Sequence, residues 1–230
     1  VQGPMGLNEI QVSAMRAQSW LQAGGQYTEH SNAVKRRQAA AAANERALHT
    51  KSKKSQPNYP LTADDLPDWA DIVVAVVVSS KGGPVKIKGM GQASEPYAVG
   101  DRKLLAMPSA RKASDLALKD SELTLKDIDL FEIGGLTLMD EAIVLESIGL
   151  AGPGQGLSVL AHHPAVNLSG GGAAGFCDPA MGLVRVVEAA LQVQGLAGAV
   201  QHPGVQRALA ICPAVVAAQT HTAIVLESAS

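Results

Sequence analysis

The sequence predicts an α/β fold in which helices cover a mixed β-sheet. Runs of β-branched residues, of which ADIVVAVVVSS (residues 70–80) is the longest, alternate along the chain with segments of helical periodicity. Hydrophobic residues make up 47% of the 230 residues and aromatic residues only 3%. We therefore expect a sizeable core that is built mainly from Ala, Val, Leu and Ile.

The first third of the chain is polar and predicts helices. Residues 7–23 carry apolar side chains at helical spacing, and residues 28–49 are rich in Ala, Arg, Gln and Glu, which favour helix. The second segment contains a basic cluster, Lys35, Arg36 and Arg37. This cluster is either a solvated helix face or a patch that meets an anionic ligand. Residues 51–60 are polar with two prolines and predict a loop.

Strands and helices alternate from residue 61 onward. The run 70–80 has the pattern of a strand that is buried on both faces, and VKIKGMGQ (85–92) alternates like a half-exposed strand. Three later segments predict helices, at 109–120, 138–150 and 183–195. Residues 123–135 predict the entry into a strand, 151–172 a loop, and 207–228 the closing strands. We therefore divide the chain into a helical segment, residues 1–60, and an α/β domain, residues 61–230.

Charge and cysteine content exclude several classes of function. The net charge of -2 provides no basic field for nucleic acid. The two cysteines, Cys177 and Cys212, form neither a disulfide framework nor a CxxC metal pair, and the adjacent His162 and His163 would point opposite ways in an extended segment. No apolar run is long enough to span a bilayer and no signal peptide is visible. We expect a cytoplasmic protein without a metal site.

A glycine-rich stretch, NLSGGGAAGFCDPAMG (167–182), stands directly before an amphipathic helix. Glycines 170–172 lack Cβ atoms, so the backbone there can adopt positive φ and be approached closely. Amide donors at the start of the helix would suit an anion, an oxyanion or a thioester carbonyl. The alternative is that the glycines only allow two backbones to pack together.

The order of the neighbouring motifs resembles the thiolase superfamily. The stretch 167–182 has the family's order of Asn-x-Ser-Gly-Gly, a tripeptide ending in Pro, and a long helix. DWADIVVAVVVSS is similar to the family's Asp-Gly-Ala-Ala-Ala strand, and LTLKDIDLFEI to its Asp-Ile-Asp…Glu segment. AAQTHTAIVLES looks like the closing strands of the bacterial lipid-transfer type. The resemblance runs from about residue 28 to the C-terminus. The resemblance implies that this chain contains one half of the duplicated thiolase fold. Residues 61–230 would form the C-terminal thiolase-like domain, and residues 1–60 would form a helical segment of the family's loop domain.

Three motifs that carry the chemistry of the family are altered here. The nucleophilic cysteine of the family lies in the N-terminal half, which this chain does not include. The second motif falls at residues 133–137, which lack the polar side chain that binds a water. The Gly-His-Pro motif falls at Cys177-Asp178-Pro179, and Cys-x-Gly-Gly at Cys212-Pro213-Ala214. A carboxylate beside Cys177 disfavours its thiolate, so we expect no activated nucleophile there.

The resemblance implies a site and a reaction class. We expect Asp178 to act as a base and Cys212 to lie at the same site, although Cys212 could instead be a buried core thiol. The residues expected to bind substrate are Asn167, Ser169, Gly170, Gly171 and Gly172. The implied activity is carbon–carbon bond cleavage or formation on an acyl-CoA, either thiolytic or retro-aldol, with no cofactor beyond the coenzyme A of the substrate.

The missing half of the fold implies a partner. A half fold would expose apolar surface to water, so we expect a partner chain that carries the N-terminal thiolase half. A small OB-fold subunit is a further candidate partner. The alternative to an enzyme is a catalytically inactive scaffold or regulatory subunit.

Overall fold

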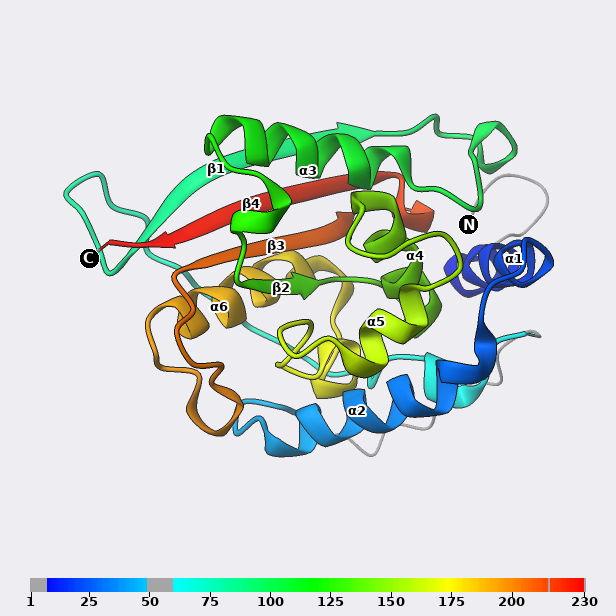
Figure 1. Ribbon diagram of the computed structural model, residues 1–230, viewed down its shortest axis with the longest axis horizontal. Helices are drawn as coiled ribbons and strands as arrows, with labels where there is room; N and C mark the ends of the chain where they lie inside the picture. The colour runs from blue at the N-terminus through cyan, green and yellow to red at the C-terminus, as the bar shows by residue number, and fades with distance from the viewer. Residues whose placement is uncertain (1–7, 49–59, 215, 230) are drawn as a thin grey trace.

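The centre of the molecule is a four-stranded mixed sheet with the strand order β1-β4-β3-β2 (Figure 1). The computed structural model describes residues 8–48, 60–214 and 216–229. The strands are β1 (Val85–Ser94), β2 (Leu130–Ile133), β3 (Arg207–Ala214) and β4 (Thr220–Ser228). The α-helices are α1 (Glu9–Gln22), α2 (His30–Ala43), α3 (Pro108–Asp120), α4 (Leu138–Ile148), α5 (Gly156–His162) and α6 (Met181–Val193). Short 3-10 helices connect them at Tyr27–Glu29, Ala63–Asp65, Val99–Asp101, Leu125–Asp127, Gly171–Ala174, Asp178–Ala180, Gly198–Val200 and Val216–Ala218.

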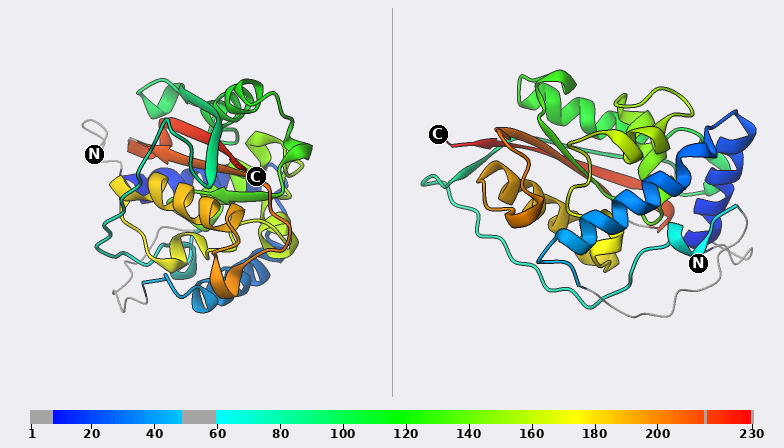
Figure 2. Two further views of the ribbon diagram at one scale, coloured as in Figure 1. Left: turned by 90° about the vertical axis from the view of Figure 1, so that its left-hand side faces the viewer. Right: turned by 60° about the horizontal axis from the view of Figure 1, so that its bottom comes forward.

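Helices cover both faces of this sheet. Strands β2 and β3 pair in parallel, whereas β4 runs antiparallel to both β3 and β1. Helix α3 packs on the β1–β4 side of one face, and α6 packs on the opposite face, mainly against β3 (Figures 1 and 2). The predicted α/β class, a mixed sheet covered by helices, is confirmed.

Helix α3 approaches the sheet closely because β1 contains glycine. A Cβ built on Gly89 would lie 2.2 Å from the carbonyl oxygen of Ala117, and one on Gly91 would lie 2.1 Å from that of Ala113. Ala113 and Ala117 are themselves completely buried. Small residues on both surfaces therefore let the helix backbone rest directly on the strand.

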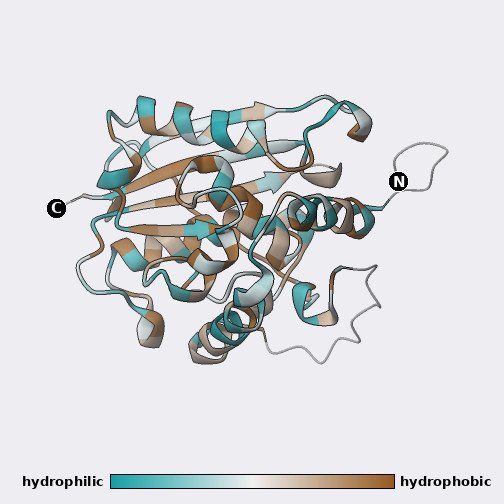
Figure 3. Cartoon of the chain, turned by 45° about the vertical axis from the view of Figure 1, so that its right-hand side comes forward, coloured by the Kyte–Doolittle hydropathy of each residue, from teal (hydrophilic) through white to brown (hydrophobic). Residues whose placement is uncertain are grey.

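The main core lies on the α3 face of the sheet. It contains buried residues of α3, α4 and α5 together with Trp20 of α1 and Ala33 and Val34 of α2. A smaller cluster lies on the other face, where Ala189 and Val193 of α6 pack on strand residues such as Leu130. Figure 3 shows hydrophobic residues along the central strands and hydrophilic residues on the outer turns of the surrounding helices.

The prediction of a buried strand at residues 70–80 is wrong. The segment is extended but belongs to no strand, and the side chains of Val73 and Val77 are 100% and 94% exposed. Its nearest sheet-like contact is an isolated bridge between Trp69 and Phe176. The β-branched composition correctly favours an extended backbone, but burial also needs neighbouring strands, and the described part of the chain places none beside it.

Two other predicted boundaries also change. The expected loop at 151–172 contains helix α5, Gly156–His162. The helix expected at 28–49 begins with a 3-10 turn and continues as α2 only from His30 to Ala43. Most of the loop predicted at 51–60 lies outside the described residues.

The basic cluster of α2 is divided between solvent and interior. Lys35 is exposed, as a solvated helix face would require. Arg36, in contrast, donates to the backbone carbonyls of Leu160 and His163, and buried Arg37 lies 3.4 Å from Glu141. Two of the three cations therefore fasten α2 to the rest of the molecule.

Candidate active site

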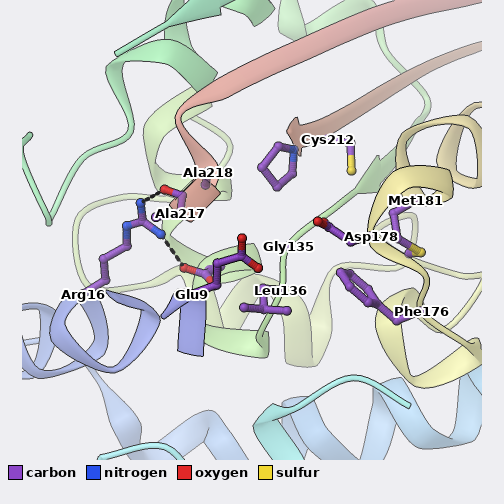
Figure 4. Close-up of a pocket in the computed structure, with 12 residues that line it drawn as sticks. Glu9, Arg16, Gly135, Leu136, Phe176, Asp178, Met181, Cys212, Ala217 and Ala218 are labelled. Carbon is purple, nitrogen blue, oxygen red and sulfur yellow. Dashed lines mark hydrogen bonds and ion pairs between the residues drawn. The ribbon is translucent and has the colours of Figure 1, made fainter. Parts of the chain in front are cut away.

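Asp178 and Cys212 lie at one pocket, shown in Figure 4. Asp178 is exposed at the rim, in the 3-10 turn that precedes α6. Cys212 is 7% exposed and comes from the C-terminal part of β3. The cavity itself has a volume of about 30 Å³, and the empty space between its walls is about 440 Å³ when the part open to solvent is included. Its lining residues are Glu9, Arg16, Gly135, Leu136, Asp140, Phe176, Asp178, Met181, Cys212, Pro213, Ala217 and Ala218.

The thiol of Cys212 is protonated at neutral pH. Burial raises its pKa to about 12, and the carboxylates of Asp178 and Glu141 act in the same direction. The guanidinium of Arg185 opposes this shift without reversing it. Cys212 therefore offers a neutral sulfur at the pocket wall, together with Phe176 and Met181, and not a ready thiolate.

Glu9 is a functional candidate that the sequence analysis missed. It occupies the first turn of α1, which begins with a capping box formed by Asn8 and Gln11. Burial raises the pKa of Glu9, and the negative charge of Asp178 raises it further. Figure 4 shows the two carboxyl groups pointing toward one another across the pocket. No local signal in the sequence could connect residues so far apart along the chain.

The environments of these two carboxyl groups differ. Glu9 lies partly buried and near a second negative charge, so it retains a proton more readily than an ordinary glutamate. Asp178 stands at the exposed rim. A pair of carboxyl groups with unequal environments is an arrangement that can divide the roles of acid and base.

A buried ion pair forms one side of the pocket. Arg16 of α1 lies 3.2 Å from Asp140 of α4, and both side chains are buried. Arg16 also donates to the carbonyl oxygen of Ala217 at 2.6 Å, and Arg102 donates to the same oxygen at 2.9 Å. Ala217 and Ala218 have φ of 56° and 55°, in the left-handed region that costs non-glycine residues energy. The two guanidinium groups hold this strained turn at the pocket rim.

The predicted substrate-binding side chains lie in buried polar networks. The side chain of Asn167 accepts from the backbone N–H of Ile133 at 2.6 Å and donates to Glu141 at 3.1 Å. The Ser169 hydroxyl donates to Glu132 at 2.7 Å. Both side chains therefore tie the glycine-rich loop to neighbouring elements.

Arg185 completes the network around Ser169. It donates from α6 to the Ser169 hydroxyl at 2.6 Å and to Glu132 at 2.9 Å. Burial raises the pKa of Glu132, and the charge of Arg185 opposes that shift. This ion pair is almost fully buried, with the Arg185 and Glu132 side chains 1% and 0% exposed. It joins α6, β2 and the loop in one cluster.

The three glycines allow close packing against α2 and the ion pairs. A Cβ on Gly170 would lie 2.6 Å from the backbone of Ala41, and one on Gly172 would lie 2.4 Å from Arg37. A Cβ on Gly171 would lie 3.0 Å from a carboxylate oxygen of Glu141. None of the five predicted substrate-binding residues lines the pocket of Asp178 and Cys212. Their role in binding substrate stays a prediction.

Within residues 8–48, 60–214 and 216–229, no group of three or more His, Cys, Asp and Glu side chains is arranged to hold a metal ion. His162 pairs with Glu29 at 2.8 Å, and the ring of His163 accepts from the backbone N–H of Ala165. In the same described part, every helix is too short or too polar to cross a membrane.

Comparison with known proteins assigns the family. The family described as "Thiolase C-terminal domain-like" matches residues 91–227. A search of curated proteins finds no match. Among solved structures, the chain is similar to an Ltp2–ChsH2 (DUF35) aldolase, with a TM-score of 0.78 and 18% identity over 98% of this chain and 65% of the other.

A second similar structure is a monomeric SCP2-thiolase-like protein type 1 from Mycobacterium smegmatis. The TM-score is 0.64 and the identity 17%, over 95% of this chain and 51% of the other. At this identity the two structures establish the fold, and the chain spans 65% and 51% of their lengths. Because the family match covers more than half of the sequence, the chain belongs to the thiolase C-terminal domain-like family.

Proposed function

We propose that this chain is a subunit of a thiolase-like enzyme that cleaves or forms a carbon–carbon bond of an acyl-CoA by retro-aldol chemistry. The observation that carries the proposal is the pocket itself, in which the carboxyl groups of Glu9 and Asp178 face one another beside a protonated thiol. This set contains groups suited to general acid and base catalysis and no ionised nucleophile.

The proposed cleavage acts on a β-hydroxyacyl thioester. Asp178 removes the proton of the β-hydroxyl group, a carbonyl forms at Cβ, and the Cα–Cβ bond breaks with its electron pair left on Cα. Glu9, whose raised pKa favours its protonated form, donates a proton to this enolate. The products are an aldehyde or ketone and a shortened acyl-CoA. One proton leaves the substrate and one returns, so no free CoA, water or redox cofactor is consumed.

Thiolysis is the less well supported reaction for this chain. It requires a thiolate that forms an acyl-enzyme, and burial raises the pKa of Cys212 to about 12. Cys177, the other cysteine, does not line the pocket. A thiolytic enzyme would therefore need its nucleophile from another chain.

A partner polypeptide is part of the proposal. The chain spans 65% and 51% of the two similar structures, and the name of the first describes an assembly of Ltp2 with ChsH2 (DUF35). By analogy, we propose a partner that carries the N-terminal thiolase half. A small OB-fold subunit is a second candidate.

The test is a product analysis with the reconstituted complex. The chain is co-expressed with polypeptides encoded beside it, and the purified complex is incubated with a β-hydroxyacyl-CoA or with a β-ketoacyl-CoA plus free CoA. We expect a carbonyl product and a shortened acyl-CoA from the first substrate, without consumption of CoA. Consumption of CoA with the second substrate would instead establish thiolysis. Absence of both reactions would favour an inactive scaffold or regulatory subunit.

A further inference from the structure

Arg102 is a buried cation that is held by backbone carbonyl groups. It is 8% exposed, and its guanidinium group donates to the carbonyl oxygens of Pro96 at 2.6 Å, Tyr97 at 2.7 Å and Ala217 at 2.9 Å. In the described part of the chain it forms no ion pair, and Glu95 favours its charge only from beyond ion-pair distance. Burial lowers the pKa of Arg102. Burying a cation without a carboxylate partner costs free energy, which points to a role for the three carbonyl contacts.

The segment that leads to Arg102 is anchored at the end of the sheet. The backbone N–H of Glu95 donates to the carbonyl oxygen of Gln219 at 2.8 Å, and the Gln219 side chain donates back to the Glu95 carbonyl at 3.1 Å. Two of the three bonds of the guanidinium group go to residues of this anchored segment. Arg102 therefore reaches Ala217 from a fixed base.

Ala217 has a strained backbone that its surroundings impose. Its φ of 56° lies in the left-handed region, which is unfavourable for a residue with a side chain. Such a conformation persists only where the contacts around it require it. Ala217 belongs to a small apolar cluster with Val12 of α1 and with Val99. Its carbonyl oxygen accepts from Arg16 as well as from Arg102.

The same residue acts on the acid of the proposed reaction. Ala217 and Glu9 line one pocket, and Figure 4 shows both there beside Arg16. Burial and the charge of Asp178 raise the pKa of Glu9, and Asp140 of α4 acts in the same direction. The backbone N–H of Ala217 opposes them, because it favours the ionised carboxylate. The position of Ala217 therefore decides part of the proton affinity of Glu9.

Arg16 does not duplicate the contact of Arg102. Arg16 lies on α1, the helix that carries Glu9, and its other bond goes to Asp140. It therefore ties the turn to the helix of the acid itself. Arg102 ties the turn to the end of the sheet, so it supplies the reference point outside that helix.

We propose that Arg102 is a positioning residue of the active site. By holding the carbonyl group of Ala217, it fixes the strained turn against Glu9 and so places the carboxyl group that donates the proton. Arg102 does not itself line the pocket. The inference rests on the proposed function, in which Glu9 is the acid, and extends it to a residue that acts through the backbone of another.

The pH dependence of cleavage by the reconstituted complex tests this role. Cleavage needs protonated Glu9, so turnover should fall as the pH rises through the pKa of Glu9. In Arg102→Met this fall should move to higher pH, because the N–H of Ala217 is no longer held against the carboxylate. We expect kcat at the optimum to drop about tenfold or more with KM little changed, since the misplaced group acts in the chemical step. A loss of stability with the kcat and pH profile of the wild type would overturn the inference.

Two further variants separate the position of the turn from burial and charge. Arg36 is also a partly buried arginine that donates to two backbone carbonyls, and it does not line the pocket. Arg36→Met should therefore lower stability and leave the pH profile unchanged, and a shift like that of Arg102→Met would overturn the inference. Arg102→Lys keeps the charge but loses the planar fork that makes three bonds. Its profile should move in the same direction as that of Arg102→Met, and a wild-type profile would overturn the role of the three bonds.

A titration of the chain without substrate separates this inference from the proposed reaction. Carbon NMR of the Glu9 carboxyl group, with Glu9→Gln to identify its signal, follows protonation directly. We expect Glu9 to titrate at higher pH in Arg102→Met than in the wild type, and Arg102→Lys replaces Arg102→Met if the latter does not fold. A moved titration without cleavage by the complex would support the positioning role and reject the proposed reaction. Cleavage by the complex with an unmoved titration would reject the positioning role and support the reaction.

Discussion

The sulfur of Cys212 lies directly against the backbone of Gly134, because a Cβ built on that glycine would be 2.3 Å from Sγ. The contact arises where β2 and β3 continue side by side, with the N–H of Gly134 donating to Ile211 at 2.7 Å. The glycine cannot retreat without breaking this hydrogen bond. Its missing side chain therefore provides the space in which the thiol is buried at the pocket wall.

Gly134→Ala should destabilise the protein. The added methyl group overlaps Sγ, and overpacking of this kind costs about 1–3 kcal/mol in the free energy of unfolding. Adding Cys212→Ala removes Sγ and should restore part of the loss, which urea unfolding would measure. The control is Gly182→Ala, whose Cβ would lie 3.8 Å from that of Cys212, an ordinary contact. Equal stability of Gly134→Ala and the wild type would contradict this packing.

Asp178→Asn and Glu9→Gln should each lower turnover of the reconstituted complex. Both substitutions keep the shape of the side chain and remove its acid–base function, so a loss of about a hundredfold or more is expected. The stability of Asp178→Asn should be nearly unchanged. Asp115→Asn, on the exposed face of α3, is the control for loss of a carboxylate. If turnover survives both Asp178→Asn and Cys212→Ser, these two residues are structural and the chemistry belongs to the partner.

Glu9 should make the stability of the protein depend on pH. Its pKa is raised in the folded protein, so the folded state binds this proton more tightly than the unfolded chain. The resulting stabilisation is fully present below the ordinary pKa of glutamate and is lost as the pH rises through the folded-state pKa. Glu9→Gln should therefore gain stability relative to the wild type between about pH 4 and pH 7. If the two proteins differ in free energy of unfolding by the same amount at every pH in this range, the raised pKa of Glu9 is ruled out.

The two cysteines should react very differently with thiol reagents. A rise of the Cys212 pKa from 9.0 to about 12 lowers its thiolate fraction on the order of a thousandfold, and burial also limits access. Cys177 is partly exposed. In iodoacetamide labelling followed by mass spectrometry, Cys177 should be modified first and Cys212 only after denaturation. Cys177→Ser isolates the slow site, and rapid labelling of that variant when native would show that Cys212 is ionised.

Arg185→Met should cost much more stability than a comparable change at the surface. It leaves the buried carboxylate of Glu132 without its cation, and breaking such a pair typically costs about 3–5 kcal/mol. Arg111→Met removes an exposed pair with Asp115 and should cost at most about 1 kcal/mol. Chemical denaturation of the two variants provides the comparison. Similar losses would mean that the Arg185 cluster contributes little to stability.

The local pattern of the sequence determined most element types and the family. Periodicity predicted α3 and α6, alternation predicted β1, and the order of the motifs indicated the thiolase superfamily. These features depend on neighbouring residues, because helix and strand preferences are set within a few positions. The division of the chain at residue 60 is also a prediction from local composition, and it stays one.

Tertiary structure decided which segments are buried and which side chains meet. The run at 70–80 has strand composition, but only the sheet order shows that none of the described strands pairs with it. Glu9 faces Asp178, and Arg37 lies beside Glu141, because α1 and α2 fold back onto the sheet domain. The glycines at 170–172 lack the side chains that would collide with α2 and with the buried Arg37 and Glu141. They therefore let segments that are distant in the sequence approach each other closely. Such contacts join residues far apart in the chain, so no local pattern encodes them.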